Sequence, residues 1–162
     1  MTLKTLIAFF IAVAFSFAAR GAGAAEADPH KSPEAKKIVA LVDQAAKLVE
    51  QKGKDAFSEL RKEKKWNNGA VYIFIDRFDG VVLLLPPTPA TEGKNLIDWQ
   101  DSKGTKVVRD IIQVAKTQGS GWVDYYWPKP GEQKESKKIS YVKKAKLPTG
   151  EEVAVGSGFY VD

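Results

Sequence analysis

Aromatic side chains gather in two segments that the sequence predicts to be neighbouring β-strands. They are Trp122, Tyr125, Tyr126 and Trp127 in the first segment and Tyr141 in the second. On a strand Tyr125 and Trp127 point to one face, because side chains alternate between faces. Tyr72 and Phe74 share a face of an earlier strand for the same reason. If both pairs face one helix, they line an apolar pocket of the kind that binds small molecules; the alternative is ordinary core packing.

Residues for catalysis or metal binding are scarce in this sequence. There is no cysteine, which excludes disulfides, thiolate metal sites and thiol nucleophiles. The one histidine, His30, falls in a predicted leader segment, so no histidine base is available to a serine nucleophile. The segment Asp101-Ser102-Lys103-Gly104 lacks the alternating oxygen ligands of a calcium loop, which favours a role in turns and caps. We therefore expect a non-catalytic protein without metal or cofactor.

Two amphipathic helices are predicted to position the aromatic strands. Ser32-Pro33-Glu34 has the capping residue, the proline and the acid that are typical of a helix start. Apolar residues then recur at helical spacing on one face: Ile38, Leu41, Val42, Ala45, Leu48 and Val49. Asp55 is placed to cap a short helical extension. A second helix carries Val107, Val108, Ile111, Ile112 and Ala115 and ends before Gly119.

The remaining segments have the β-branched and aromatic composition of strands. Residues 70–75 and 81–85 are joined by Phe78-Asp79-Gly80, a turn sequence, and are predicted to form a hairpin. Three further strands are predicted over residues 122–127, 139–145 and 152–160. Prolines at 86, 87 and 89 open a long connection before the second helix. Short turns between consecutive strands favour antiparallel pairing, so the sequence predicts an α+β domain with one sheet.

The amino-terminal segment predicts export. Lys4 precedes an uncharged apolar run over residues 6–19, and Ala22-Gly23-Ala24 fits a cleavage site, so residues 1–25 are predicted to be a cleaved signal peptide. The apolar run is too short for a membrane anchor. Residues 26–32 are predicted to be a flexible leader. Loss of Lys4 and Arg20 lowers the formal charge from +5 to +3, a mild surplus that favours no nucleic-acid partner. We expect a periplasmic or secreted protein.

Several pieces of the sequence resemble the single Cache domain, type 2. They are Tyr72-Ile73-Phe74, Asp79-Gly80, Pro86, residues 93–96 and 101–104, residues 121–125 with Trp127-Pro128, residues 138–142 and residues 156–160. The resemblance covers residues 33–162, which we take as one domain. It implies a PAS-like five-stranded antiparallel sheet, with the long amino-terminal helix on one face and the second helix and loops on the other.

The resemblance also implies a ligand site. Lys138 matches the family's lysine just before the Ile139-Ser140-Tyr141 run, where contact with a ligand carboxylate is implied; by itself it is one of several lysines that are expected to be solvated. Lys138 and Tyr141 point to opposite faces of an ideal strand, so both reach one pocket only at a strand end or bulge. The predicted ligand-binding residues are Tyr72, Phe74, Trp122, Tyr125, Trp127, Lys138 and Tyr141.

Two departures from the family pattern qualify this resemblance. Leu85 stands before Pro86, where the family often has histidine, and this leaves the ligand's identity open. No transmembrane or signalling segment follows Asp162, so we expect a stand-alone exported member. The favoured hypothesis is a non-catalytic module that binds or senses a short organic acid. The alternative is a ligand-free interaction module that docks on a membrane chemoreceptor or histidine kinase.

Overall fold

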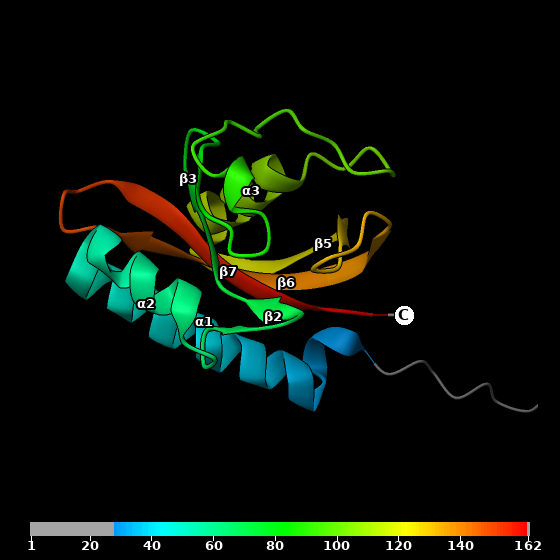
Figure 1. Cartoon of the computed structure of the whole chain (residues 1–162), viewed down its shortest axis with the longest axis horizontal. Coiled ribbons are helices and arrows are strands. Elements are labelled where there is room, and N and C mark those ends of the chain that lie inside the picture. Colours follow the sequence, from blue (N-terminus) through cyan, green and yellow to red (C-terminus); the bar gives the residue numbers. More distant parts are fainter. Residues whose placement is uncertain (1–27, 162) are drawn as a thin grey trace, which may run out of the picture.

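A five-stranded antiparallel sheet separates two helical layers in the computed structural model, which describes residues 28–161 (Figure 1). The predicted signal peptide lies outside the described residues. The strand order is β4 (Val82–Leu84), β3 (Phe74–Arg77), β7 (Glu152–Tyr160), β6 (Glu135–Lys146), β5 (Ser120–Pro128). Helices α1 (Pro33–Lys52) and α2 (Ala56–Lys62) cover one face and α3 (Val107–Gln118) covers the other. The predicted α+β fold and its PAS-like layering are confirmed.

The long helix α1 begins where its sequence predicts. The Ser32 hydroxyl accepts a hydrogen bond from Ala35 N at 3.0 Å, and Pro33 occupies the first turn. A short 3-10 turn, η2 (Gly53–Asp55), leads into α2. Asp55 makes no side-chain capping bond, so the predicted cap is wrong. The reason is geometric: Asp55 already has helical backbone angles, since the 3-10 turn runs directly into α2.

The strands alternate between two cores, as the period of two requires. Ile73, Ile75, Val153 and Val155 join the core beneath α1. Their neighbours along the chain, such as Phe74 and Ala154, join the core beneath α3. β7 lies in the middle of the sheet and pairs with β3 on one side and β6 on the other. The predicted hairpin of β3 and β4 forms the far edge.

Two glycines of β7 allow neighbouring groups to approach the strand closely. Gly156 pairs with Phe74, and a Cβ atom at Gly156 would overlap the Phe74 ring. A Cβ atom at Gly158 would overlap the Ser140 hydroxyl and the Ile139 carbonyl. Glycine at these positions permits a close approach that no other residue allows. Both close contacts lie on the side of the sheet that α3 covers.

Residues 28–32, predicted to belong to a flexible leader, include a 3-10 turn, η1 (Pro29–Lys31). The His30 ring nitrogens lie 2.9 Å from Asp28 Oδ1 and 2.8 Å from Asp124 Oδ1. The imidazole also meets the edge of Trp122, with ring centroids 5.5 Å apart. Asp124 belongs to β5 and is 94 residues away in sequence, so local patterns give no sign of this contact.

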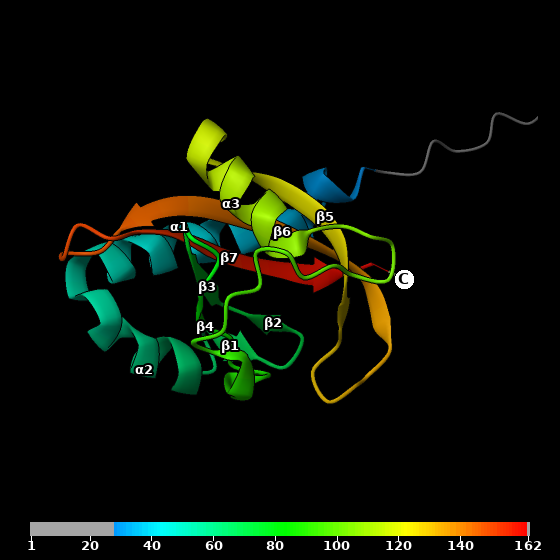
Figure 2. The same cartoon turned by 90° about the horizontal axis from the view of Figure 1, so that it is seen from above.

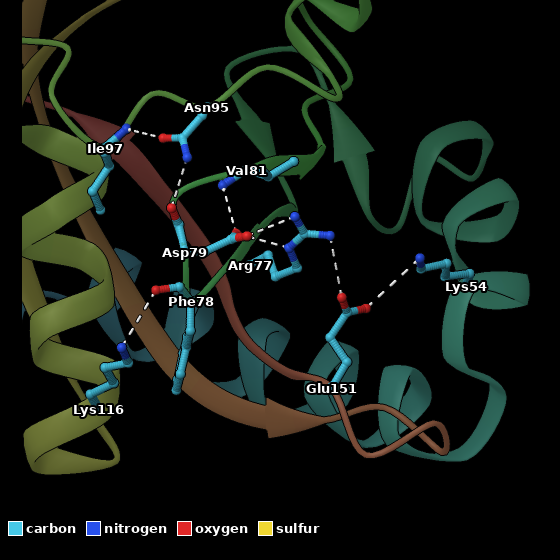
Figure 3. A network of polar contacts seen from close by, with 9 residues as sticks. All are labelled: Lys54, Arg77, Phe78, Asp79, Val81, Asn95, Ile97, Lys116 and Glu151. Carbon is cyan, nitrogen blue, oxygen red and sulfur yellow. Dashed lines mark hydrogen bonds and ion pairs between the residues drawn. The ribbon is translucent and has the colours of Figure 1, made fainter.

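A polar network fastens the β3–β4 turn to its surroundings (Figure 3). Arg77 donates to the Asp79 carboxylate at 2.8 and 2.7 Å and lies 3.5 Å from Glu151, in the turn between β6 and β7. Asn95 Nδ2 donates to the Asp79 carbonyl at 2.9 Å, and Asn95 Oδ1 accepts from Ile97 N at 2.9 Å. The network therefore fixes the connection between β4 and α3 against the hairpin.

Candidate ligand-binding site

A small cavity is lined by residues of the sheet, of α3 and of the connection that leads into this helix. Figure 2 shows how α3 and this connection lie over the sheet. The cavity has a volume of about 20 Å³, which is room for about one water molecule. Its wall consists of aromatic and aliphatic side chains with one carboxyl group: Tyr72, Phe74, Asp76, Val82, Leu85, Leu96, Val107, Val108, Ile111, Tyr125 and Trp127. The site therefore combines apolar walls with a few polar groups, as small-molecule sites do.

Four predicted site residues meet in this wall. Tyr72, in the short strand β2 (Val71–Tyr72), and Phe74 come from one edge of the cavity, and Tyr125 and Trp127 come from β5. The Tyr125 hydroxyl lies 2.9 Å from the Ser140 hydroxyl on β6, so it is paired although it is buried. The Tyr125 and Trp127 rings meet edge to face with centroids 6.2 Å apart. The strand period explains why these rings gather, since each pair shares one face.

Lys138 lies on the same face, but it stands beside the cavity and does not line it. Its side chain is 0% exposed. The Nζ atom lies 3.9 Å from the ring centroid of Tyr72, 5.7 Å from that of Phe74 and 5.2 Å from that of Tyr160. Within residues 28–161 it has no hydrogen bond or ion pair. Burial lowers the pKa of Lys138 from 10.5 to about 7, since a low-dielectric site disfavours the charged form.

Trp122 and Tyr141 do not reach the cavity. They are directly opposite each other on β5 and β6, their ring centroids are 5.3 Å apart, and both pack against the core beneath α1. The prediction grouped them with Lys138, but β6 shows no bulge between Lys138 and Tyr141 that could bring both to one face. Strand parity therefore places these two rings on the face of the sheet opposite Lys138, away from the cavity.

Asp76 is the cavity residue that sequence reasoning missed. It lies on β3, two residues after Phe74, and is only 3% exposed. Its carboxyl group has no hydrogen-bond or ion-pair partner within residues 28–161. Burial raises the pKa of Asp76 from 3.8 to about 7. The signal was present, because Tyr72, Phe74 and Asp76 are spaced two apart and must share a face of an extended chain.

An open groove adjoins the cavity. It has a volume of about 310 Å³ and is lined by prolines, Trp99 and residues 128–132. Leu96 and Trp127 line both the groove and the cavity. Trp99 packs edge to face on Trp127, with centroids 4.9 Å apart. Leu96 and Trp127 therefore lie between the inner cavity and the outer groove.

Asp101 has the turn role that its segment predicts. Its Oδ1 atom accepts from Lys103 N and Thr105 N at 2.9 and 2.8 Å, and its Oδ2 atom accepts from Tyr126 N at 2.8 Å. The carboxylate therefore ties the connection before α3 to β5. No helix among residues 28–161 is both long and apolar enough to cross a bilayer.

The sequence pattern of the Cache domain family matches residues 34–162. The methyl-accepting chemotaxis protein McpP of Pseudomonas putida (strain KT2440) is 33% identical over 91 residues, which are 56% of this chain and 16% of that protein. The sensor histidine kinase MctS of Rhizobium johnstonii is 34% identical over 91 residues, 56% of this chain and 19% of the kinase. The matched segments thus span less than a fifth of either relative.

Solved structures match over most of the described chain. A periplasmic sensor domain of a chemotaxis protein superposes with a TM-score of 0.68 at 31% identity, covering 80% of this chain and 95% of that one. A Cache chemosensory domain whose structure explains carboxylic acid recognition superposes with a TM-score of 0.68 at 28% identity. That match covers 79% of this chain and 93% of the other.

Proposed function

The chain belongs to the Cache domain family, and from that premise we propose that it is a periplasmic sensing module that binds a short carboxylic acid between its sheet and α3. The family supplies non-catalytic sensor domains, some of them in chemotaxis receptors. The similarity to a domain that recognises carboxylic acids supports the ligand class. In this proposal the protein lies in the periplasm, and its partner is a chemoreceptor or a histidine kinase.

The observation that carries the proposal is the buried, unpaired ammonium group of Lys138. A buried charge is costly unless an opposite charge accompanies it. Aromatic rings surround Nζ, and no carboxylate among residues 28–161 neutralises it. A ligand carboxylate would supply that partner through a charge-assisted hydrogen bond that contributes about 1.5–3 kcal/mol. The site therefore lacks an anionic partner for Lys138, and the carboxylate of a bound acid would provide one.

Ligand entry requires side chains to move, because the cavity of about 20 Å³ is too small for an acid of several heavy atoms. In our proposal the side chains of Leu96 and Trp127 change rotamer, and this movement connects the cavity to the outer groove. A turn of the Tyr72 ring then brings Lys138 Nζ to the ligand. A ligand of about six heavy atoms gains at most ~9 kcal/mol, so we expect micromolar affinity at best.

The test is a titration of the protein with acetate, propionate, pyruvate and lactate, followed by thermal unfolding and calorimetry. At least one acid should raise the melting temperature at millimolar concentration, since ligand at 100 times its Kd adds about 2.7 kcal/mol of stability. Lys138→Met should abolish the response. Lys137→Met is the matched control, because Lys137 is 43% exposed and pairs with Asp124 at 3.4 Å.

If no acid stabilises the protein, the acid-sensing proposal is wrong. The small volume of the cavity would then favour the alternative, a ligand-free module that docks on a receptor or kinase. Equal responses of the native protein and Lys138→Met would show that acid binds elsewhere. Both outcomes are decided by the same titration series.

A further inference from the structure

Asp76 is the only charged residue in the cavity wall that residues 28–161 form. Its carboxyl group is almost fully buried and has no partner among those residues. Most of the surrounding wall is aliphatic: Val82, Leu85, Leu96, Val107, Val108 and Ile111. An unpaired carboxylate in such a wall is unstable relative to the protonated carboxylic acid. The structure therefore presents a hydrogen-bond donor to the cavity near neutral pH, where the pKa of about 7 leaves Asp76 partly protonated.

The neighbouring groups do not compensate a negative charge on Asp76. Tyr72 and Tyr125 stay neutral, because burial raises the pKa of each hydroxyl above its usual value. Lys138 lies at the Tyr72 ring, outside the cavity wall. Arg77, the next residue of β3, is engaged by Asp79 and Glu151.

The cations of the flanking elements are also directed elsewhere. Lys116 on α3 donates to the Phe78 carbonyl at 3.4 Å. Lys144 on β6 is held by Glu152 at 2.6 Å. The protonation state of Asp76 therefore decides whether the cavity wall carries a negative charge.

A ligand carboxylate meets this group on entry. Two carboxylates that share a desolvated site cannot both ionise, so one of them carries a proton. A free short acid is fully ionised at neutral pH, whereas Asp76 is already close to protonation. The proton therefore resides on Asp76 at lower cost than on the ligand.

We propose that Asp76 joins the complex as a neutral carboxylic acid and donates its O–H to the ligand carboxylate, so that acid binding takes up a proton from solvent. This inference rests on the proposed function and adds a second ligand-binding residue to Lys138. The two residues have different roles. The ammonium group of Lys138 balances the ligand's charge, and the protonated carboxyl group of Asp76 donates a hydrogen bond from the cavity wall. Proton uptake makes acid binding weaken as pH rises.

The size of the effect follows from the protonated fraction. With a pKa of about 7, roughly one Asp76 side chain in eleven is protonated at pH 8 and most are protonated at pH 6. The native protein should therefore bind an acid about tenfold more weakly at pH 8 than a variant whose residue 76 is always neutral. Near pH 6 the two should bind almost equally.

The experiment compares the native protein with Asp76→Asn and Asp76→Leu by calorimetric titration with propionate and acetate at pH 6 and pH 8. Asparagine keeps the shape and a donor but carries no charge, and leucine keeps neither donor nor charge. Asp76→Asn should bind about tenfold more tightly than the native protein at pH 8 and about equally at pH 6. Asp76→Leu should bind weakly at both pH values. Lys138 titrates in the native protein and in Asp76→Asn alike, so their ratio isolates Asp76.

Three results would overturn the inference in distinguishable ways. No acid binding by the native protein at pH 6 ends both this inference and the proposed function. Acid binding with the same Asp76→Asn to native ratio at both pH values ends only the role of Asp76. Binding of methylammonium by the native protein, lost in Asp76→Asn, would show that Asp76 serves as an anionic partner of a cation. Circular dichroism at the assay temperature confirms that each variant is folded.

Discussion

Replacement of Lys138 by methionine should stabilise the folded protein, although the ammonium group of Lys138 is the proposed partner of the ligand carboxylate. The side chain is 0% exposed, and burial lowers its pKa from 10.5 to about 7. A change of this size corresponds to a penalty of about 5 kcal/mol on the charged form. The contact of Nζ with the Tyr72 ring at 3.9 Å returns at most about 2 kcal/mol. Methionine has a similar length and no charge, so the variant should be about 3 kcal/mol more stable near pH 6.

The pH dependence of this gain has a definite sign. Below pH 7 the lysine is protonated in both the folded and the unfolded states, and the penalty is constant. Between pH 7 and 10.5 only the unfolded state holds the proton, so the native protein gains stability as pH rises. The advantage of Lys138→Met should therefore shrink across this range and be lost before pH 10.

The assay is urea unfolding of the native protein, Lys138→Met and Lys137→Met at pH 6, 8 and 10. Lys137 is the adjacent residue on the opposite face and is 43% exposed, so its replacement should change stability by no more than about 0.5 kcal/mol. A loss of stability in Lys138→Met at pH 6, or a gain that stays constant with pH, would refute the reasoning. The first would mean that the ring contacts outweigh desolvation, and the second that the ammonium group is not desolvated.

Three further changes test the packing around the site and the amino-terminal turn. Gly156→Ala places a Cβ atom in the Phe74 ring and should destabilise the fold by about 1–3 kcal/mol, measured by urea unfolding. Ser140→Ala leaves the buried Tyr125 hydroxyl without its 2.9 Å partner and should cost about 1–3 kcal/mol, whereas Tyr125→Phe in the same background should recover part of that loss. His30→Gln should lower stability by about 1 kcal/mol at pH 5 and by less at pH 8. The hydrogen bonds to Asp124 and Asp28 raise the pKa of His30, so its contribution is complete below the unfolded pKa of 6.5 and is lost as pH rises through the folded pKa; an equal loss at both pH values would contradict this.

The helices and the antiparallel sheet could be predicted from the sequence because they depend on local patterns. Helix α1 follows from the Ser32-Pro33 start and from apolar residues at helical spacing. The sheet follows from strand-like segments separated by short turns, which favour antiparallel neighbours. The resemblance to the Cache domain family then supplied the layering of the helices, which local patterns do not determine.

The same local rules also determined part of the site. Tyr72 and Phe74 share a face, as do Tyr125 and Trp127, and all four line one cavity. A stricter use of strand parity would have added Asp76 and removed Trp122 and Tyr141, since no bulge interrupts β6. Strand period alone thus assigns Asp76, Trp122 and Tyr141 to their faces of the sheet.

Tertiary structure alone decided the environment of the charged groups. Lysines occur throughout this chain, and the local sequence does not show that Lys138 is buried among rings whereas Lys137, on the other face, is partly exposed. The pairing of His30 with Asp124 likewise joins residues 94 positions apart. The sequence determines which face a side chain takes, because that depends on backbone period. Burial and pKa depend on what other parts of the chain bring to that face, and only folding settles this.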